Sequence, residues 1–320
     1  MGFDVSGLRE YVKENEAGLI AKAILGARYL SIGTDIQEGV KKFDTINTLS
    51  DEVIFRLGAC GFTAAGDTTF SQQIMEVATI TLDKDWCLKD LNGTFLEKTL
   101  PRGTYADAMP GEIENVWADY FSGLVAKEIE AMVIKGDKDL SSGNLSLIDG
   151  LLKRLSEAPI DGGYAGVVID GNTAGLTALD ASNIIAAINA IIATQHVDTL
   201  EMDDVQLQVG YDVFRLYTQA LKALDPRNYN IDGNEDAYRI FIYGTNVELV
   251  AYKGFNNTNE MLLTSVNNVV TPTDLESDFE DWRVGYDEKE DKVWLKIMGK
   301  IGGAYLRFPE MASHFKLALS

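Results

Sequence analysis

The chain has few of the side chains that most often carry out chemistry in proteins. Its 320 residues include two cysteines, Cys60 and Cys87, and two histidines, His196 and His314. The cysteines form no C-x-x-C motif and the histidines lie far from them, so the spacing of a structural zinc site is missing. We therefore expect no metal and no cofactor, and we interpret both cysteines as free, largely buried thiols that serve as small apolar side chains.

The common motifs of enzymes are missing as well. The sequence contains no P-loop, no H-E-x-x-H, no G-x-S-x-G and no glycine-rich dinucleotide turn between a strand and a helix. His196 ends an isoleucine-rich helical stretch, where a surface or capping role is typical, and His314 is no better a catalytic candidate. Acidic pairs such as Asp203 and Asp204 are expected by chance among 49 acidic residues. We expect a protein that is not an enzyme.

Two short stretches resemble the beginning of a calcium-binding loop. Asp232, Asn234 and Asp236 form one, and Asp170 and Asn172 begin the other. Neither stretch has the glutamate that such a loop needs at its twelfth position. Both are therefore interpreted as ordinary Asx turns.

Positive charge and long apolar runs are also scarce. Lys and Arg number 28 against 49 Asp and Glu, so the formal net charge is -21 and a phosphate backbone would on average be repelled. No stretch approaches the ~18 uninterrupted apolar residues of a membrane span, and the first residues do not read as a signal peptide. We expect a soluble protein made in the cytoplasm that does not read nucleic-acid sequence.

The first third of the chain is predicted to hold an amphipathic helix and then a long β-hairpin. Apolar residues recur at helical spacing between positions 4 and 30. From about Ser31 to Leu82, β-branched and aromatic residues alternate with polar ones and glycines recur, which predicts extended strands. The turn is expected at Ala64 to Asp67, because Gly66 can adopt a positive φ.

This hairpin carries apolar side chains that have little of their own domain to pack against. They are Phe62, Phe70 and Ile74. The hairpin either folds back onto its own chain or is covered by a neighbouring chain. Cys60 is expected on the outgoing strand and Cys87 just beyond the returning one.

A long helix is predicted from about Gly111 to Lys135, because apolar residues repeat there at intervals of three and four. Pro110 before it and Gly136 after it match the usual start and stop signals. The residues expected to form its core-facing side are Ile113, Trp117, Tyr120, Leu124 and Met132.

The remainder alternates helices and strands and then becomes rich in strands. The pattern predicts helices near 148–159, 179–195 and 211–224, strands at 205–210 and 261–266, and hairpins at 239–252 and 282–308. A long arm, a long helix, the lack of a catalytic constellation and the strong net charge together indicate a self-assembling protein.

Several runs of residues resemble a known family along nearly the whole chain. They are C-G-F-x-A-x-G-x-T-x-F at 60–70, W-C-L-K-D-L at 86–91, I-K-G-D at 134–137, V-G-Y-D-V-F-R-L-Y-T-Q-A-L at 209–221, Y-G-T-N-V-E-L-V-A-Y at 243–252 and K-I-G-G-A-Y-L-R-F-P-E at 300–310. In this order they resemble the major capsid proteins of tailed double-stranded DNA bacteriophages, most closely those of phages that infect Bacteroidetes.

The resemblance implies an α+β, HK97-like phage capsid fold with defined parts. Residues 1–30 would be the N-terminal arm, 31–85 the extended β-hairpin called the E-loop, and 86–159 the peripheral domain with its spine helix. Residues 160–267 would form the α/β axial domain, and 268–320 the peripheral β-hairpin and C-terminal tail.

It also implies a function and partners. The protein would self-assemble as hexamers and pentamers into the icosahedral head of a virion, assembled in the bacterial cytoplasm, and would contact the packaged DNA only non-specifically. Phe62, Phe70 and Ile74 would make inter-subunit contacts, and the other expected partners are portal, scaffolding and decoration proteins. Two alternatives stay open: an encapsulin-type nanocompartment shell, and a carboxylate-dependent α+β hydrolase, which would need two carboxylates in one cleft.

Overall fold

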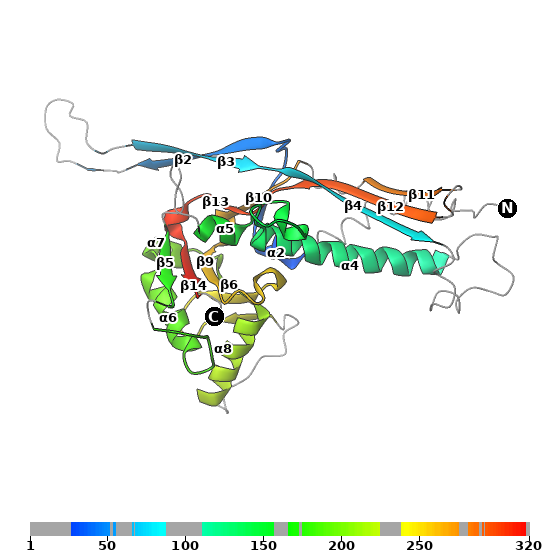
Figure 1. The fold of residues 1–320 in the computed structure, drawn as a ribbon. Helices are drawn as coiled ribbons and strands as arrows, with labels where there is room; N and C mark the ends of the chain where they lie inside the picture. Colours follow the sequence, from blue (N-terminus) through cyan, green and yellow to red (C-terminus); the bar gives the residue numbers. More distant parts are fainter. Residues whose placement is uncertain are drawn as a thin grey trace, which may run out of the picture.

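The molecule is elongated, with a compact body and two extensions that leave it in opposite directions (Figure 1). One extension is the hairpin of β2 (Phe43–Asp51) and β3 (Thr68–Glu76), and the other holds the long helix α4 (Gly111–Lys135) beneath a narrow sheet. The computed structural model describes residues 27–51, 54–55, 66, 68–87, 111–156, 166–172, 175–224, 238–274, 281–287, 290 and 292–317.

Helix α4 (Gly111–Lys135) has the bounds that the sequence predicts. Its C-terminal half packs into the first hydrophobic core, to which Ile129, Met132 and Val133 contribute buried side chains. Leu124 is 41% exposed in the isolated chain, so its own chain does not bury it fully and its place in the core stays a prediction. The side chains of the other three predicted core residues on this helix, Ile113, Trp117 and Tyr120, lie outside the described residues.

A three-stranded antiparallel sheet runs along α4, with β12 (Lys292–Ile301) between β11 (Asp281–Asp287) and β4 (Ala78–Cys87). Leu295, Ile297 and Ile301 alternate along β12 and are buried in the core.

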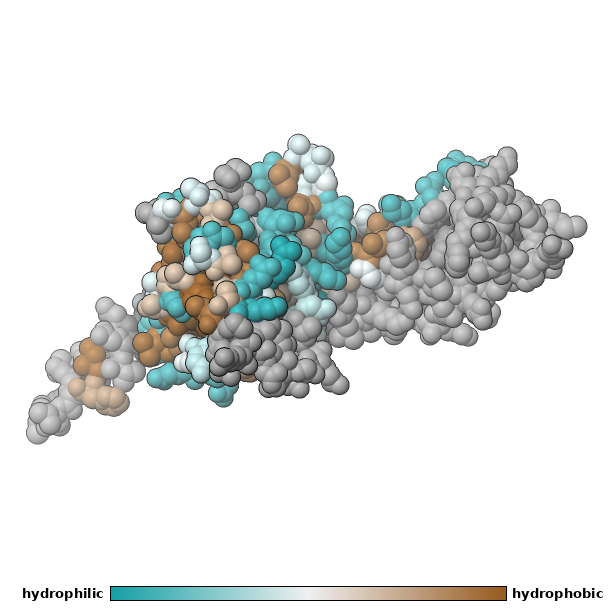
Figure 2. Space-filling view, turned by 90° about the horizontal axis from the view of Figure 1, so that it is seen from below, coloured by the Kyte–Doolittle hydropathy of each residue, from teal (hydrophilic) through white to brown (hydrophobic). Residues whose placement is uncertain are grey.

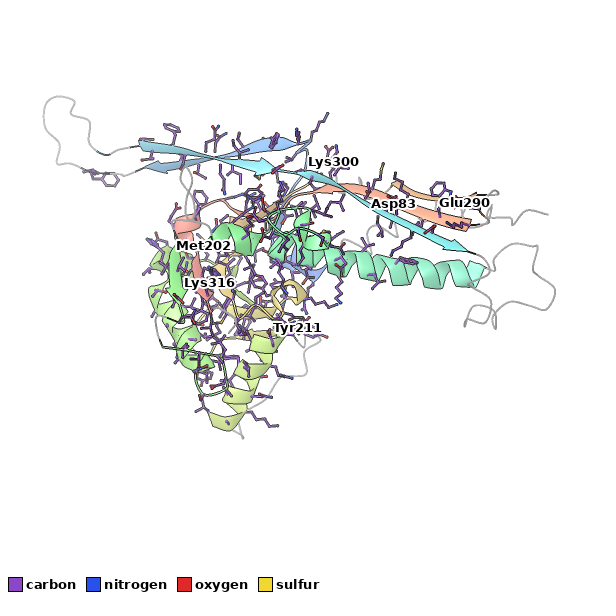
Figure 3. The ribbon with its side chains drawn as sticks, viewed as in Figure 1. Asp83, Met202, Tyr211, Glu290, Lys300 and Lys316 are labelled. Carbon is purple, nitrogen blue, oxygen red and sulfur yellow. The ribbon has the colours of Figure 1, made fainter. Side chains whose placement is uncertain are left out.

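The other face of this sheet carries paired charges. Lys292 lies 3.1 Å from Asp85 and Lys300 contacts Asp274, and Figure 3 shows Lys300 and Asp83 along this sheet. The side chains along these strands thus alternate with a period of two, with apolar residues on the inner face of the sheet and charged residues on its outer face.

The predicted hairpin region of residues 31–85 therefore divides in two. Only β2 (Phe43–Asp51) and β3 (Thr68–Glu76) pair with each other, whereas β4 pairs with β12 from Ala78 to Cys87. The physical reason is that Ile80 and Leu82 of β4 pack against the first core, which the projecting hairpin does not reach.

The second unit is built on a six-stranded sheet with the order β5-β14-β9-β6-β8-β7. Its strands are β5 (Val167–Asp170), β14 (Ser313–Lys316), β9 (Met261–Ser265), β6 (Val205–Val209), β8 (Glu248–Ala251) and β7 (Arg239–Phe241). Helices α6 (Ile184–Thr194) and α8 (Tyr211–Leu224) share a second hydrophobic core with this sheet.

The C-terminal strand β14 corrects a predicted boundary. Residues 268–320 were expected to belong to the peripheral unit, but β14 inserts between β5 and β9 of the six-stranded sheet. Phe315 and Leu317 are buried in the second core, and this burial explains why the strand lies there.

Small elements connect the two units. A three-stranded sheet joins β1 (Asp35–Gln37), β10 (Val269–Pro272) and β13 (Tyr305–Leu306). The short helices are α2 (Arg28–Ile32), α5 (Leu151–Ser156), α7 (Val197–Leu200), η2 (Asn144–Ser146), η3 (Lys253–Phe255), η4 (Val266–Asn268) and η6 (Pro309–Met311).

A buried carboxylate holds α4 against the second unit. The Gly254 amide of η3 donates to Glu130 Oε1 on α4 at 2.9 Å, and Tyr29 of α2 packs edge-on against Tyr252 with ring centroids 5.2 Å apart. Burial raises the pKa of the Glu130 carboxyl, and backbone amides partly offset this effect. A Cβ on Gly254 would lie 2.2 Å from the Cδ1 atom of Ile134 and 3.0 Å from the Glu130 carbonyl oxygen, so any larger residue would force the Ile134 side chain to shift.

Candidate functional site: the projecting hairpin

The hairpin of β2 and β3 extends from the body as a two-stranded ribbon (Figure 1). Its antiparallel register places Phe43 opposite Glu76 at the base and Asp51 opposite Thr68 at the far end. The connection between the strands therefore spans positions 52–67. An isolated two-stranded ribbon is marginally stable in water, so a ribbon of this length gains stability from any surface that covers it.

The register gathers the large apolar residues of the hairpin on one face. Leu49 lies directly opposite Phe70, and Ile74 lies opposite Thr45, diagonally beside Phe43. In the isolated chain Phe70 is 80% exposed, Ile74 63%, Phe43 56% and Leu49 55%. We call these four residues the apolar hairpin face. Single exposed apolar residues are ordinary, but four on one face of a projecting ribbon indicate a contact surface.

The centre of this face is polar and structured. Gln72 Nε2 donates to Asn47 Oδ1 at 2.8 Å, between the Leu49–Phe70 pair and the Ile74–Phe43 pair. A partner would therefore meet two apolar areas separated by an amide pair that is already hydrogen-bonded.

The opposite face of the hairpin is anchored at its base. Ile46 and Met75 are buried there and form a third, small core with Val40, Val77, Val270 and Tyr305. Since the two faces of a strand alternate, anchoring Ile46 and Met75 turns the apolar hairpin face away from the body.

Polar contacts fix the last residue of β3 to the body. The Glu76 amide donates to the Tyr305 hydroxyl oxygen at 2.8 Å, and the Lys138 ammonium lies 2.6 Å from the Glu76 carboxylate. The Arg154 guanidinium lies 3.8 Å from the centroid of the Tyr305 ring. A Cβ on Gly302 would lie 2.4 Å from the Glu76 carbonyl oxygen, so the backbones approach closely. The base is thus held rigidly while the rest of the ribbon projects.

The structure describes only some of the residues that the sequence predicts on the hairpin. Phe70 and Ile74 lie on the apolar hairpin face, whereas Phe62 and Cys60 lie outside the described residues. Gly66 has the expected positive φ of 95°, and the other residues of the predicted turn at 64–67 lie outside the described residues.

Sequence reasoning missed Phe43 and Leu49, which complete the apolar hairpin face. Both lie on β2 at positions separated by an even number of residues, and this spacing was the available signal. Cys87 ends β4 opposite Lys292, in the sheet beside α4 and not at the base of the hairpin.

The candidate chemical residues have structural roles. His196 caps α7 and accepts a hydrogen bond from the Asp198 amide at 3.4 Å. His314 is fully buried on β14, with Nε2 2.8 Å from Glu260 Oε2. Asp204 Oδ2 accepts from the Ser265 hydroxyl at 2.6 Å and fastens the end of β9.

The first candidate calcium loop lies outside the described residues, and the second forms a turn. The Asn172 amide donates to Asp170 Oδ1 at 2.9 Å, which is the predicted Asx turn. Within the described ranges, no group of three or more His, Cys, Asp and Glu side chains has an arrangement suited to a metal ion. None of the helices in those ranges is long and apolar enough to cross a membrane.

The densest group of charges that the structure describes lies where α4 ends. The Lys153 ammonium lies within 2.9 Å of three carboxylates, those of Asp137, Asp139 and Asp149. Hydrogen bonds from Lys153 lower the pKa of Asp137, and the carboxylates raise that of Lys153. The ammonium of Lys153 forms ion pairs with all three carboxylates around it, so we interpret the group as a structural ion-pair cluster between α4 and α5.

Comparison by sequence identifies no relative, since no family model and no curated protein matches the chain. Comparison by structure does. A chain of the cyanophage A-1(L) capsid asymmetric unit is similar with a TM-score of 0.59 and 12% identity, covering 94% of each chain.

Two further solved structures are similar over comparable lengths. A chain of the satellite phage P4 procapsid, determined with its size determination protein, has a TM-score of 0.54 at 14% identity and covers 95% of this chain and 92% of that one. A chain of the capsid of Myoviridae phage XM1 has a TM-score of 0.52 at 16% identity and covers 91% and 92%. At such identities the likeness establishes a shared fold.

Proposed function

We propose that this chain, which has the HK97-like α+β capsid fold, is a major capsid protein that self-assembles into the icosahedral shell of a tailed bacteriophage. The proposal rests mainly on the likeness of fold, which covers more than nine tenths of this chain and of each similar capsid chain.

The apolar hairpin face supports the same proposal from physical chemistry. Its base is rigid and its large side chains face away from the body, so its own chain does not bury them. Covering them with another copy would bury apolar area in every subunit contact. We propose that Phe70, Ile74 and also Phe62 make this contact in hexamers and pentamers.

We further propose that the chain acts as a structural component of the virion and performs no catalysis. The packaged double-stranded DNA would be contacted only non-specifically, in keeping with the net charge of -21. Portal, scaffolding and decoration proteins would be its other partners, assembly would take place in the bacterial cytoplasm, and the host would belong to the Bacteroidetes, as the sequence runs suggest.

Electron microscopy of the purified chain and its sedimentation velocity test this proposal. We expect closed shells or capsomers whose amount rises with concentration. A stable monomer under all assembly conditions would count against it. Shells that co-purify with a cargo enzyme would favour the nanocompartment alternative, and hydrolysis by a monomer would favour the hydrolase.

A further inference from the structure

We propose that Glu130 makes the docking of α2 on the body proton-linked, so that this short helix is held more firmly as the pH falls. Glu130 is a buried acidic residue that the proposed function does not use, and α2 (Arg28–Ile32) lies at the end of the predicted N-terminal arm. The inference concerns a single chain, so it stands or falls independently of the proposed self-assembly.

Helix α2 depends on the rest of the molecule for the hydrogen bonds of its first turn. It has five residues, its N-cap is Ala27, no side chain caps it, and its first turn holds no acidic residue. The first amides of a helix have no partner within the helix, and a helix this short is unstable on its own in water. An acceptor from another element must therefore serve the start of α2.

The Glu130 carboxylate of α4 is that acceptor. It accepts a hydrogen bond from the Tyr29 amide of α2, and it also accepts from the amides of Lys253 and Gly254 in η3, the latter at 2.9 Å. Helix α2 packs against both α4 and η3, and Figure 1 shows it beside the C-terminal end of α4. One carboxylate thus joins three elements that are far apart in the sequence.

The docked helix closes the surroundings of this carboxylate to water. Tyr29 is fully buried, and its ring packs edge-on against that of Tyr252 with the centroids 5.2 Å apart. Just after α2, the Gly33 carbonyl accepts from Gln208 Nε2 at 2.8 Å. With α2 in place Glu130 is only 1% exposed, so undocking of α2 would bring its carboxylate into water.

The buried charge is compensated by amides and not by a cation. Among the residues that the structure describes, no ammonium or guanidinium group forms an ion pair with Glu130, and the charge of Lys253 has a smaller effect than the three amides. Burial has the largest effect and raises the pKa of the Glu130 carboxyl, although the amides lower it in part. The neutral form of the carboxyl is therefore favoured more when α2 is docked than when the group lies in water.

The other titratable groups around Glu130 do not change their charge where a carboxyl titrates. Burial raises the pKa of each tyrosine hydroxyl that faces it, so these hydroxyls stay neutral. The tyrosines are Tyr29 of α2, Tyr211 of α8 and Tyr252 directly after β8. The charged groups nearby are Lys253 of η3 and Arg28 of α2, whose guanidinium lies 4.5 Å from the centroid of the Tyr238 ring.

The direction of the pH effect follows from these contacts. Since the docked form binds the proton of Glu130 more tightly than the undocked form, docking should strengthen as the pH falls towards the ordinary pKa of a glutamate. The contribution of this proton disappears as the pH rises through the raised pKa of the docked form. The end of the predicted arm is thus fixed at low pH and released more readily at high pH.

Hydrogen exchange of the wild-type monomer, measured by mass spectrometry and corrected for the intrinsic exchange rate, tests the inference. The reporters are the amides of Leu30 and Ser31, which donate to the Ala27 carbonyl, and of Gly33, which donates to the Tyr29 carbonyl. Their protection should rise roughly threefold or more between about pH 8 and pH 5.

Helix α6 is the internal reference. No Asp, Glu, Lys or Arg occurs from Ala181 to Val197. The helix lies on the flank opposite the α4 extension (Figure 1), and Figure 2 shows a hydrophobic area on that side of the body. Its amides should gain less protection than those of α2, and an equal gain in α6 would overturn the inference because it would reflect the stability of the whole chain.

Two substitutions on α4 complete the test. Glu130→Gln keeps the size of the side chain and one acceptor oxygen but cannot titrate, so the pH dependence of protection in α2 should disappear. Glu128→Gln is the matched control, because Glu128 is exposed on the same helix and its substitution should leave the pH dependence unchanged.

Three results would overturn the inference. They are protection of α2 in the wild type that stays constant or falls as the pH falls, a pH dependence that persists in Glu130→Gln, and one that is lost equally in Glu128→Gln. If Glu130→Gln does not fold, the comparison of α2 with α6 in the wild type decides alone.

Discussion

Replacing Phe70 with alanine should weaken assembly without destabilising the monomer. Phe70 is 80% exposed in the isolated chain, so the substitution removes little that the folded monomer buries. Fully burying a phenylalanine contributes ~1.5–3 kcal/mol, and four fifths of that amount is still available for an inter-subunit contact. We therefore expect a loss of about 1–2 kcal/mol per contact, or roughly five- to thirtyfold in each association constant.

The assay is the concentration at which shells or capsomers first appear, measured by sedimentation velocity and by electron microscopy of the same samples. Thr69→Ala is the matched control, because Thr69 is the next residue of β3 and lies on the opposite face of the ribbon. The reasoning is refuted if Phe70→Ala assembles at the wild-type concentration, or if Thr69→Ala weakens assembly as much. A lower thermal midpoint of the monomeric Phe70→Ala variant would show that the side chain is buried within its own chain.

Three further predictions concern the framework that positions these surfaces. Gly123→Ala should raise the free energy of unfolding of the monomer by up to about 1 kcal/mol, because a Cβ there has open space on helix α4. Gly136→Ala should lower the free energy of unfolding by an amount several times larger, since its Cβ would lie 2.3 Å from the Ile148 carbonyl oxygen. Chemical denaturation measures both changes. Tyr305→Phe should remove the acceptor for the Glu76 amide, cost about 1 kcal/mol and speed hydrogen exchange of that amide. The raised pKa of Glu130 means that the folded state binds the proton of this carboxyl more tightly than the unfolded state does. The stability that this proton contributes should therefore grow as the pH falls towards the ordinary pKa of a glutamate, and disappear as the pH rises. The free energy of unfolding of the wild type, relative to that of Glu130→Gln, should increase as the pH falls, and a difference that does not change with pH would contradict this.

Local sequence patterns predicted the helices well. The bounds of α4 and α8 agree with the expected 111–135 and 211–224, because a periodicity of three and four over many residues is a strong signal. The hairpin of β7 and β8 lies within the predicted 239–252, and Gly244 between the two strands has a φ of 79°. The expected α+β capsid fold is confirmed by its likeness to solved capsid chains.

Pairing over long sequence separations could not be predicted in the same way. β4 continues the alternation of β3, and no local residue indicates that it pairs with β12 about 200 residues later. β14 was predicted as part of a tail, since its place between β5 and β9 depends on a core formed by distant segments.

The candidate site shows the same limit. Phe70 and Ile74 were identifiable as apolar residues on a hairpin, but Leu49 joins them only through a register that sequence alone left open. Leu124 is exposed in the isolated chain although it shares the helical periodicity of the buried residues, because periodicity does not reveal where a long helix leaves the core that it enters.

The central claim is that copies of this chain associate through the hairpin and build a shell. Its most direct test is a cryo-electron microscopy reconstruction of particles assembled from the purified protein, examined at the apolar hairpin face. The account predicts closed particles in which Phe70, Leu49 and Ile74 of each subunit are buried against a neighbouring subunit. Particles in which this face stays exposed to solvent, or a chain that remains monomeric under all assembly conditions, would contradict it.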